Sequence, residues 1–313
     1  MELRQLRYFL GVCEAGSFLK ASARLHIAQP ALGQQMSALE DELGVRLLLR
    51  SSKGVTLTSA GKTFLEHARL VLADVERASL AVREAGSIPS GNVAIGLPAT
   101  VAPGATLPIL LACRERLPQV RLKIVEAYSD FLKEWLQSGR LDVAILFGDK
   151  PESGLTKREL LDEQLVFVTS ASATALPKKL SLQRVAQWPL VLPSSEHGLR
   201  RIIEGAYAPL GLTLDVVAEI DSLSSVKKAT EAGIGSTILP LVSVAEEIAA
   251  GKLQASRIAS DLMSDRLVCA TNVTRPSTPA SSAVFALVQR VIHEMVASKS
   301  WPGHSMFNRP ARS

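Results

Sequence analysis

A pair of short helices joined by a tight turn is the feature that most constrains what this chain can fold into. The sequence predicts one helix over 18–25, a turn over 26–28, and a second helix that opens at Gln29-Pro30 and stops at Gly44. Proline suits the first turn of a helix because its missing N–H has no partner there, and glycine suits the position after the last turn. The spacing therefore predicts a helix-turn-helix motif.

The residues on either side of the motif complete a small domain. Leucines recur on one helical face before it, Gly16 ends that helix, and Ser17 is placed to cap the next one. After the motif, residues 46–57 predict a basic hairpin, which in this position is a wing. We expect residues 1–58 to form an all-α winged helix-turn-helix domain.

The placement of charge in this domain is more informative than the total. Residues 15–39 contain no Asp or Glu, but they include Lys20 and Arg24. Three acidic residues then follow one another at 40–42. A surface that approaches phosphate is arranged this way, with acids held off the contact face. The net charge of +5 is weaker evidence, because an ordinary protein with a basic excess explains it equally well.

The segment 59–90 predicts a long helix followed by a hinge. Leu65, Ala68 and Leu72 begin a near-heptad apolar rhythm along it, and glycine, serine and proline fill its last residues. An exposed helix with a single apolar seam needs a partner, so we interpret this segment as a linker and dimerisation helix.

Residues 91–313 alternate between strand-like and helix-like patterns, which predicts βαβ units with mostly parallel strands. One set of elements covers about 91–162, a second covers about 163–265, and the segments over 266–300 pack back onto the first. The predicted fold class is α/β overall. Its C-terminal part is a two-lobed α/β domain, like a periplasmic binding protein, with two crossover strands.

Several function classes are disfavoured by what the sequence lacks. The three cysteines are scattered and match no metal-ligand spacing, so we expect inert thiols, a reducing cytoplasm and no metal site. No Walker loop or dinucleotide fingerprint occurs, so we expect no cofactor. There is neither a signal peptide nor a stretch of about 20 apolar residues, so we expect a cytoplasmic protein without a membrane partner.

Two rival functions compete with DNA binding. An enzyme would use Ser194, Ser195 and His197, which lie close in sequence, but no strained nucleophile turn surrounds them, so we expect no catalytic residue. A periplasmic solute-binding protein would suit the C-terminal part. The missing export signal and the fused helix-turn-helix argue against that reading.

An ordered pattern covers most of the first sixty residues or so. It comprises Gly16-Ser17-Phe18, Ala21, Leu25, Gln29-Pro30-Ala31-Leu32, Gln35, Leu39-Glu40, Leu43-Gly44, Arg50, Leu57-Thr58 and Ala60-Gly61. This pattern resembles the LysR-type transcriptional regulators, and a weaker likeness continues at 232–235 and 238–240. The sequence of residues 26–32, followed by Gln34-Gln35, is similar to that of the nitrogen-assimilation regulators within the family.

The resemblance implies a transcriptional regulator that binds double-stranded promoter DNA and responds to a small-molecule effector. It also implies self-association as a dimer, a tetramer on DNA, and a dyad-symmetric operator. RNA polymerase is an open candidate partner.

Three positions depart from the family's pattern. Gly33 stands where serine is usual, Leu48 where phenylalanine is usual, and Leu19 where threonine is common. A glycine inside a helix costs about 1 kcal/mol relative to alanine. The hydroxyl that a serine would offer to DNA is also lost, so the operator sequence is harder to infer.

The expected DNA contacts follow from the geometry of the motif. The N-terminal end of the second helix reaches base edges in the major groove. Gln29 and Gln34 carry the amide fork that pairs with adenine, and Pro30 and Ala31 suit a thymine methyl group. The full expected set is Ser17, Lys20, Arg24, Gln29, Pro30, Ala31, Gly33, Gln34, Arg50 and Lys53.

The basic residues of this set have a different expected role. Lys20, Arg24 and Arg50 are candidate phosphate contacts, and Lys53 is placed to reach the neighbouring minor groove from the wing. For Lys20 and Arg24 the alternative is an ordinary solvated charge on a helix.

The resemblance also implies an effector cleft between the lobes. The family's cleft positions correspond here to Thr100, Ser129, Phe147, Ser195, His197 and Ser222. Hydroxyls and free N–H groups at helix starts suit a carboxylate or another anion, whereas the apolar Phe147 argues against a doubly charged ligand. Helix capping or loop packing is the alternative at each of these positions.

Overall fold

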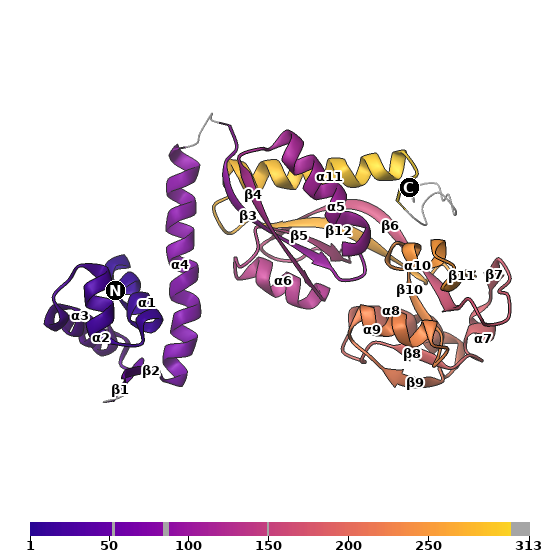
Figure 1. The fold of residues 1–313 in the computed structure, drawn as a ribbon, viewed down its shortest axis with the longest axis horizontal. Coiled ribbons are helices and arrows are strands. Elements are labelled where there is room, and N and C mark those ends of the chain that lie inside the picture. Colours follow the sequence, from indigo (N-terminus) through magenta and orange to yellow (C-terminus); the bar gives the residue numbers. More distant parts are fainter. Residues whose placement is uncertain (52–53, 84–87, 149, 302–313) are drawn as a thin grey trace. The chain divides into compact units, whose positions relative to one another are not determined.

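The computed structural model describes residues 1–51, 54–83, 88–148 and 150–301 (Figure 1). Contacts within the chain divide it into two compact units, residues 1–85 and residues 86–313. We call these the N-terminal unit and the C-terminal unit.

The N-terminal unit packs its helices and one hairpin around a single core (Figure 1). The helix-turn-helix, the wing and the long helix lie where the sequence predicted them. The elements are α1 (Leu3–Ala15), α2 (Phe18–Leu25), α3 (Gln29–Leu43), β1 (Leu48–Ser51), β2 (Gly54–Leu57) and α4 (Ser59–Arg83).

Backbone conformation explains why these helices begin and end where they do. Gly16 and Gly44 follow α1 and α3 with φ of 62° and 66°, a left-handed conformation that glycine adopts without a Cβ penalty. His26 takes the same region at the end of α2, with φ of 53°. Ser17 stands at the N-cap of α2, but its hydroxyl makes no capping hydrogen bond, in contrast to the sequence-based expectation. Pro30 lies in the first turn of α3, as predicted.

A buried carboxylate that sequence reasoning missed connects α3 to the hairpin. Glu40 is 3% exposed and accepts hydrogen bonds from the amides of Leu47 (2.7 Å) and Leu48 (2.9 Å) and from Arg46 Nη1 (2.9 Å). Burial acts to raise the pKa of Glu40, but the two amides and Arg46 outweigh it and hold that pKa below its usual value. The spacing of Leu32, Met36, Leu39 and Leu43 predicts that all four lie on the buried face of α3, but this is wrong for Leu43, which is 38% exposed where the helix ends.

Only part of α4 contributes to this core. Ala68 is buried, and Phe64 packs edge-on against Phe9 of α1 with ring centroids 5.0 Å apart. Farther along, Val71 and Val82 are 40% and 79% exposed. The second half of α4 therefore leaves apolar side chains uncovered within the unit.

The C-terminal unit has two α/β lobes (Figure 1). Lobe 1 contains β3 (Gly91–Pro98), α5 (Ala102–Arg116), β4 (Val120–Ala127), α6 (Ser129–Gln137), β5 (Val143–Phe147), β12 (Ser264–Asn272) and α11 (Pro279–Ala297). Lobe 2 contains β7 (Lys179–Leu180), α7 (Leu182–Val185), β8 (Leu190–Leu192), α8 (Gly198–Tyr207), β9 (Val216–Glu219), α9 (Leu223–Glu231), β10 (Thr237–Pro240), α10 (Ala245–Ala249) and β11 (Leu253–Ile258). Short 3₁₀ turns follow α8 and β10. The sequence analysis did not predict β7, α7, α10 or β11. The first three are too short to show a hydrophobic period.

Strand β6 (Leu155–Ser170) belongs to both lobes. Its first part pairs with β12 of lobe 1, and residues 165–170 pair with β10 and β11 of lobe 2. The chain returns to lobe 1 between β11 and β12, so the lobes are joined by two crossings, as predicted.

The expectation of mostly parallel strands is only partly correct. Strands β4, β3 and β5 are parallel neighbours in lobe 1, and β8 and β9 are parallel in lobe 2. Strand β12 is antiparallel to β5 and β6, and β10 and β11 are antiparallel to β6. Antiparallel partners need no helical crossover, so the alternation of strands and helices did not reveal these pairings.

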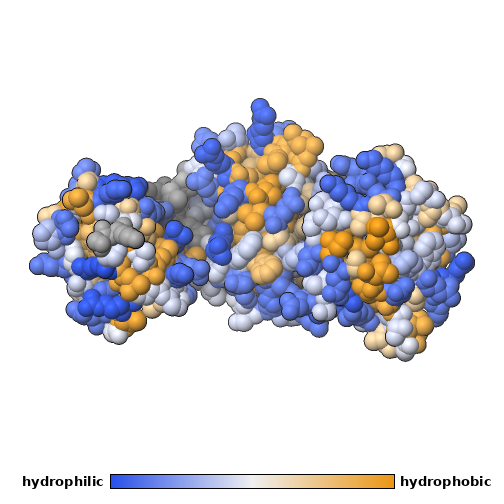
Figure 2. Space-filling model, turned by 60° about the horizontal axis from the view of Figure 1, so that its bottom comes forward, coloured by the Kyte–Doolittle hydropathy of each residue, from blue (hydrophilic) through white to orange (hydrophobic). Residues whose placement is uncertain are grey.

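Helices cover both faces of each lobe. In lobe 1, α5 and α11 pack on one face of the sheet and α6 on the other (Figure 1). In lobe 2, α8 and α9 contribute to separate apolar clusters on the two faces. Hydrophobic side chains also reach the molecular surface (Figure 2), and Leu107 and Leu111 of α5 are 62% and 58% exposed. Within the described ranges, no helix has the length and apolarity needed to span a bilayer.

A second buried carboxyl lies on the strand that both lobes share. Glu163 of β6 is 2% exposed, and it accepts a hydrogen bond of 2.8 Å from Trp301 Nε1. Trp301 is itself fully buried in the core of lobe 1. Burial raises the pKa of Glu163 to about 8, and the Trp301 hydrogen bond only partly opposes that rise. This carboxyl is therefore protonated at neutral pH.

We predict that Glu163 makes the folded protein less stable as pH rises. The carboxyl ionises in the unfolded chain above its ordinary pKa of 4.5, but in the folded protein only above about 8, so the folded state holds the extra proton in this window. The free energy of unfolding of Glu163→Gln, relative to wild type, should therefore increase from pH 4.5 to pH 8. Urea unfolding at a series of pH values measures this, and parallel pH profiles for the two proteins would contradict it.

We also predict opposite effects for alanine at two helical glycines. A Cβ at Gly33 would lie 4.0 Å from its nearest neighbour, Arg50 Nη1, so Gly33→Ala should stabilise α3 by up to about 1 kcal/mol. A Cβ at Gly61 of α4 would lie 2.0 Å from the Leu47 carbonyl oxygen, so Gly61→Ala should destabilise by about 1–3 kcal/mol. Thermal unfolding of the two variants compares them directly, and a shift of the same sign in both would refute the packing argument.

Candidate functional site

The first turns of α3 present polar side chains away from the core. Gln29, Pro30 and Gln34 are exposed, whereas Ala31 and Gly33 are half-buried. The opposite face of α3 is anchored by fully buried side chains, Leu32, Met36 and Leu39. A rigid helix with a polar exposed end can enter the major groove of a duplex.

The predicted basic residues occupy different surroundings. Lys20 and Arg24 on α2 are exposed, and Arg24 pairs weakly with Glu14 at 3.9 Å. Arg50 on β1 is exposed and lies beside Gly33 of α3, so the structure brings these two positions together. Lys53 lies outside the described residues. Ser17 is half-buried at the start of α2.

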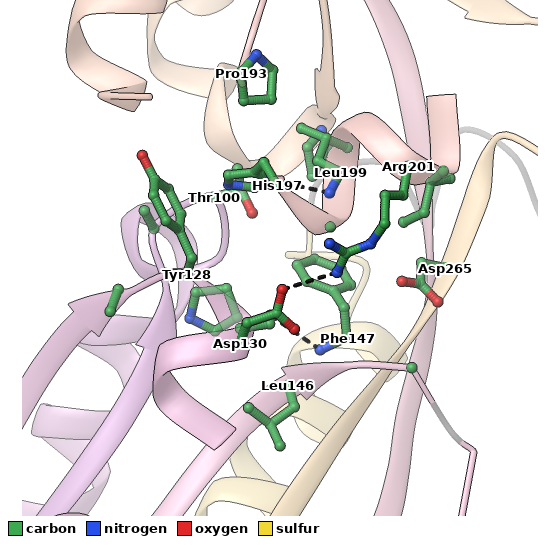
Figure 3. A pocket seen from close by; sticks show the side chains of 18 of the residues that line it. Thr100, Tyr128, Asp130, Leu146, Phe147, Pro193, His197, Leu199, Arg201 and Asp265 are labelled. Atoms are coloured by element: carbon green, nitrogen blue, oxygen red, sulfur yellow. Dashed lines mark hydrogen bonds and ion pairs between the residues drawn. The ribbon is translucent and has the colours of Figure 1, made fainter. Parts of the chain in front are cut away.

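A cavity of about 480 Å³ lies between the two lobes of the C-terminal unit (Figure 3). Thr100, Ser129, Phe147 and His197 all line it. Ser195 and Ser222 are not among its lining residues. Both are exposed, and Ser222 shares a 3.0 Å hydrogen bond with Ser224.

The start of α5 offers few free amides to the cavity. Thr100 precedes α5, but Pro103 in the first turn has no N–H, and the amides of Gly104 and Ala105 already bond to the Val101 carbonyl at 3.1 Å. The free N–H groups expected for an anion are therefore scarcer at α5 than the sequence suggested.

The other two predicted residues of lobe 1 contact each other. Ser129 begins α6, and its hydroxyl accepts a hydrogen bond of 3.4 Å from the Phe147 amide at the end of β5. The Phe147 ring contributes to the apolar side of the cavity, which continues through Leu165 of β6 and Leu239 of β10.

Contacts between the lobes close one side of the cavity. The Tyr128 ring meets the His197 ring edge-on, with centroids 4.2 Å apart, and the Tyr128 hydroxyl donates to the Asp221 carbonyl oxygen. Arg201 Nη2 donates to Asp130 Oδ2 at 2.9 Å, and these side chains point toward each other (Figure 3). Sequence reasoning missed Tyr128, Asp130 and Arg201. Their position next to the predicted helix starts was the only available signal.

His197 is held in its neutral form. Burial lowers its pKa, and nearby Asp221 and Asp130 oppose that shift without overcoming it. Its Nδ1 accepts a hydrogen bond of 3.0 Å from the Leu199 amide, so Nδ1 carries no proton. The ring therefore caps α8 and presents an uncharged surface to the cavity.

The charged groups along the cavity balance one another. Its described lining includes four cations, Lys133, Lys150, Lys157 and Arg201, and four acids, Asp130, Glu152, Asp221 and Asp265. Glu152 pairs with Lys133 and also with Lys157 at 3.2 Å, and these contacts hold the pKa of Glu152 below its usual value although burial acts to raise it. The cavity thus has no net formal charge among these residues.

The thiols are poor nucleophiles. Burial raises the pKa of Cys13 to about 11, and it raises those of the buried Cys113 and Cys269 as well. At neutral pH all three are protonated, which agrees with the expectation of inert thiols. In the described residues, no group of three or more His, Cys, Asp or Glu side chains is arranged to hold a metal ion.

Comparison with known proteins gives matches over both units. The model of the LysR substrate binding domain matches residues 86–292, and the model of the bacterial regulatory helix-turn-helix protein, lysR family, matches residues 3–62. The nitrogen assimilation regulatory protein Nac of Escherichia coli K12 is 35% identical over 300 residues, covering 96% of this chain and 98% of that protein. Nac of Klebsiella aerogenes is also 35% identical, covering 93% and 95%.

A solved structure supports the same assignment. Full-length CbnR complexed with its target DNA is 26% identical, with a TM-score of 0.67, and the match covers 93% of this chain and 100% of that one. The sequence-based resemblance to LysR-type regulators, including the nitrogen-assimilation group, is confirmed by these matches. The chain belongs to the LysR family of helix-turn-helix transcriptional regulators, with a DNA-binding N-terminal unit and a substrate-binding domain in its C-terminal unit.

Proposed function

We propose that this regulator reads promoter DNA with the first turns of α3 and is switched by an effector in the interlobe cavity. The observation that carries the proposal is the joint exposure of Gln29, Pro30 and Gln34 on a helix whose other face is fixed in the core. Side chains on a rigid helix lose little freedom when they meet base edges, so they suit sequence-specific contacts.

The proposed contacts divide into two kinds. Gln29 and Gln34 read adenine, and Pro30 and Ala31 contact thymine methyl groups. The remaining members of the predicted set, Ser17, Lys20, Arg24, Gly33, Arg50 and Lys53, lie along the phosphate backbone or approach it closely, and Lys53 enters the minor groove.

We further propose a division into a DNA-binding domain (1–58), a linker and dimerisation helix with its hinge (59–90), and an effector domain (91–313). The uncovered Val71 and Val82 on α4 favour pairing of two copies through this helix. Two half-sites are what specific binding by such a small module needs. Exposed leucines on α5 offer a further surface for assembly into a tetramer.

The cavity favours an effector with at most one charge. Its cations and acids balance, few amides are free at α5, and the walls formed by Phe147, Leu165 and Leu239 are apolar. A second carboxylate would add negative charge to a lining whose cations and acids already balance, with little to compensate for its lost hydration. Several relatives at 31–32% identity are named hydrogen peroxide-inducible genes activators. The raised thiol pKa values speak against a thiolate-based peroxide response in this chain.

We propose that the protein acts in the cytoplasm, where promoter DNA is.

We propose no catalytic role for the cavity. The Nδ1 of His197 is engaged by the Leu199 amide, and Ser195 lies outside the cavity lining. A serine and histidine arranged for nucleophilic chemistry would instead face each other across a hydrogen bond.

We predict that Gln34→Ala and Arg50→Ala affect DNA binding differently. Gln34→Ala should reduce discrimination at one base pair by about 1–3 kcal/mol, because it removes a base contact. Arg50→Ala should weaken binding to all DNA sequences alike, because a phosphate contact carries no sequence information. Footprinting of the full chain on the promoter of its own gene locates the operator, and titration of point-mutated operators separates the two effects.

Two results would count against this scheme. Failure of the wild-type protein to protect any DNA would refute the proposed function. Equal effects of the two substitutions on base preference would refute the division of roles.

We predict that the full chain binds a neutral aromatic amide or a monoacid better than the matching diacid. Benzamide, benzoate and terephthalate form such a series, because the ring is constant while the charge grows. Phe147→Arg should improve binding of terephthalate relative to benzamide, because it adds a cation to the cavity wall, whereas Phe147→Leu should not. Thermal-shift titration ranks the three compounds, and tightest binding of terephthalate to the wild-type protein would refute the charge argument.

A further inference from the structure

The guanidinium of Arg50 is held by side chains from two other elements of the N-terminal unit. Arg50 extends from β1, and its guanidinium carbon lies 4.4 Å from the centre of the Phe18 ring at the start of α2. Arg50 Nη2 also lies 3.5 Å from the Ser37 hydroxyl of α3. The wing, α2 and α3 thus meet at one cationic side chain.

Gly33 leaves the space beside this guanidinium open. A Cβ at position 33 would already come within 4.0 Å of Arg50 Nη1, so any longer side chain there would share the space that the guanidinium occupies. Gly33, Gln34 and Ser37 lie within about one turn of α3, so Arg50 lies beside the turn of the helix that presents Gln34. The glycine that departs from the family's usual serine therefore has a structural consequence in this chain.

The charge of Arg50 is not neutralised by any residue that the structure describes. No carboxylate among the described residues pairs with it, in contrast to Arg24 and Arg46, which pair with Glu14 and Glu40. Stacking on an aromatic ring uses the flat face of a guanidinium, whereas its N–H donors lie along its edge. The Phe18 ring therefore limits where the guanidinium can lie, and the N–H donors that do not reach Ser37 stay available to an anion.

We propose that Phe18 is a positioning residue for DNA binding, whose ring holds the Arg50 guanidinium against α3 in the orientation that meets a backbone phosphate. The inference rests on the proposed function, in which α3 faces the duplex. Phe18 itself touches no DNA in this scheme, and it acts by reducing the conformational freedom that Arg50 would lose on binding.

A double-mutant cycle in the full chain tests the inference. Phe18→Leu, Arg50→Ala and the double variant are titrated with a mixed-sequence DNA duplex by fluorescence anisotropy, between roughly 50 and 200 mM salt. Phe18→Leu should weaken binding by about two- to five-fold when Arg50 is present, the size of an exposed cation–π contact, and should have no further effect when residue 50 is alanine.

The salt dependence separates positioning from charge. Arg50→Ala should lower the slope of log K against log salt by about 0.9 for each bound subunit, whereas Phe18→Leu should leave that slope unchanged because the charge remains. Arg7→Ala on α1 is a matched control, since Arg7 is exposed and has no place in the proposed contact set. Phe18→Tyr keeps the ring and should bind like wild type, so the inference stays testable even where Phe18→Leu fails to fold.

The outcomes distinguish this inference from the function on which it rests. Equal weakening by Phe18→Leu with and without Arg50, or an unchanged salt slope in Arg50→Ala, overturns the positioning role while DNA binding stands. Loss of affinity in Phe18→Tyr equal to that in Phe18→Leu overturns it as well. A wild-type protein that does not bind the duplex refutes the proposed function instead.

Discussion

The cleft of this regulator depends on one strand that two sheets share. Strand β6 pairs with β12 in lobe 1 and then with β10 and β11 in lobe 2, so its backbone hydrogen bonds hold both lobes in register on a common element. A movement of one lobe against the other must bend this strand or the return between β11 and β12. Glu163 lies near the change of partners and is fastened by Trp301 to the core of lobe 1, which gives the lobe 1 side of the crossing a fixed anchor.

A comparable constraint organises the N-terminal unit. The ionised carboxylate of Glu40 accepts hydrogen bonds from the first two amides of the hairpin, and these bonds hold the wing against α3. Arg50, carried by that hairpin, is then brought to Gly33 and Ser37 on the exposed side of the same helix. The side chains proposed to read bases and to contact phosphates therefore lie on neighbouring elements of one unit, although they are separated in sequence.

Sequence reasoning succeeded where a local signal sets the structure. The bounds of α2 and α3 agree with prediction because Gly16, Pro30 and Gly44 act through backbone conformation and need no distant partner. It failed where the outcome depends on distant residues. The antiparallel pairing of β12 joins segments about a hundred residues apart, and the amides that donate hydrogen bonds to Glu40 come from a hairpin that no helical period describes. Of the six predicted effector residues, four line the cavity, whereas Ser195 and Ser222 do not.

The sequence by itself determined the helix-turn-helix, the long helix, the α/β character of the C-terminal part and the family. The first three follow from short-range periodicity and capping residues, and the family follows from an ordered motif. Only the tertiary structure decided which charges meet. The pairing of Arg201 with Asp130, the neutral state of His197, the protonated Glu163 and the guanidinium of Arg50 over Phe18 all arise from contacts between separate elements. Hydrogen bonds and ring contacts form only between groups a few ångströms apart, and such distances between separate elements are set only when the chain has folded.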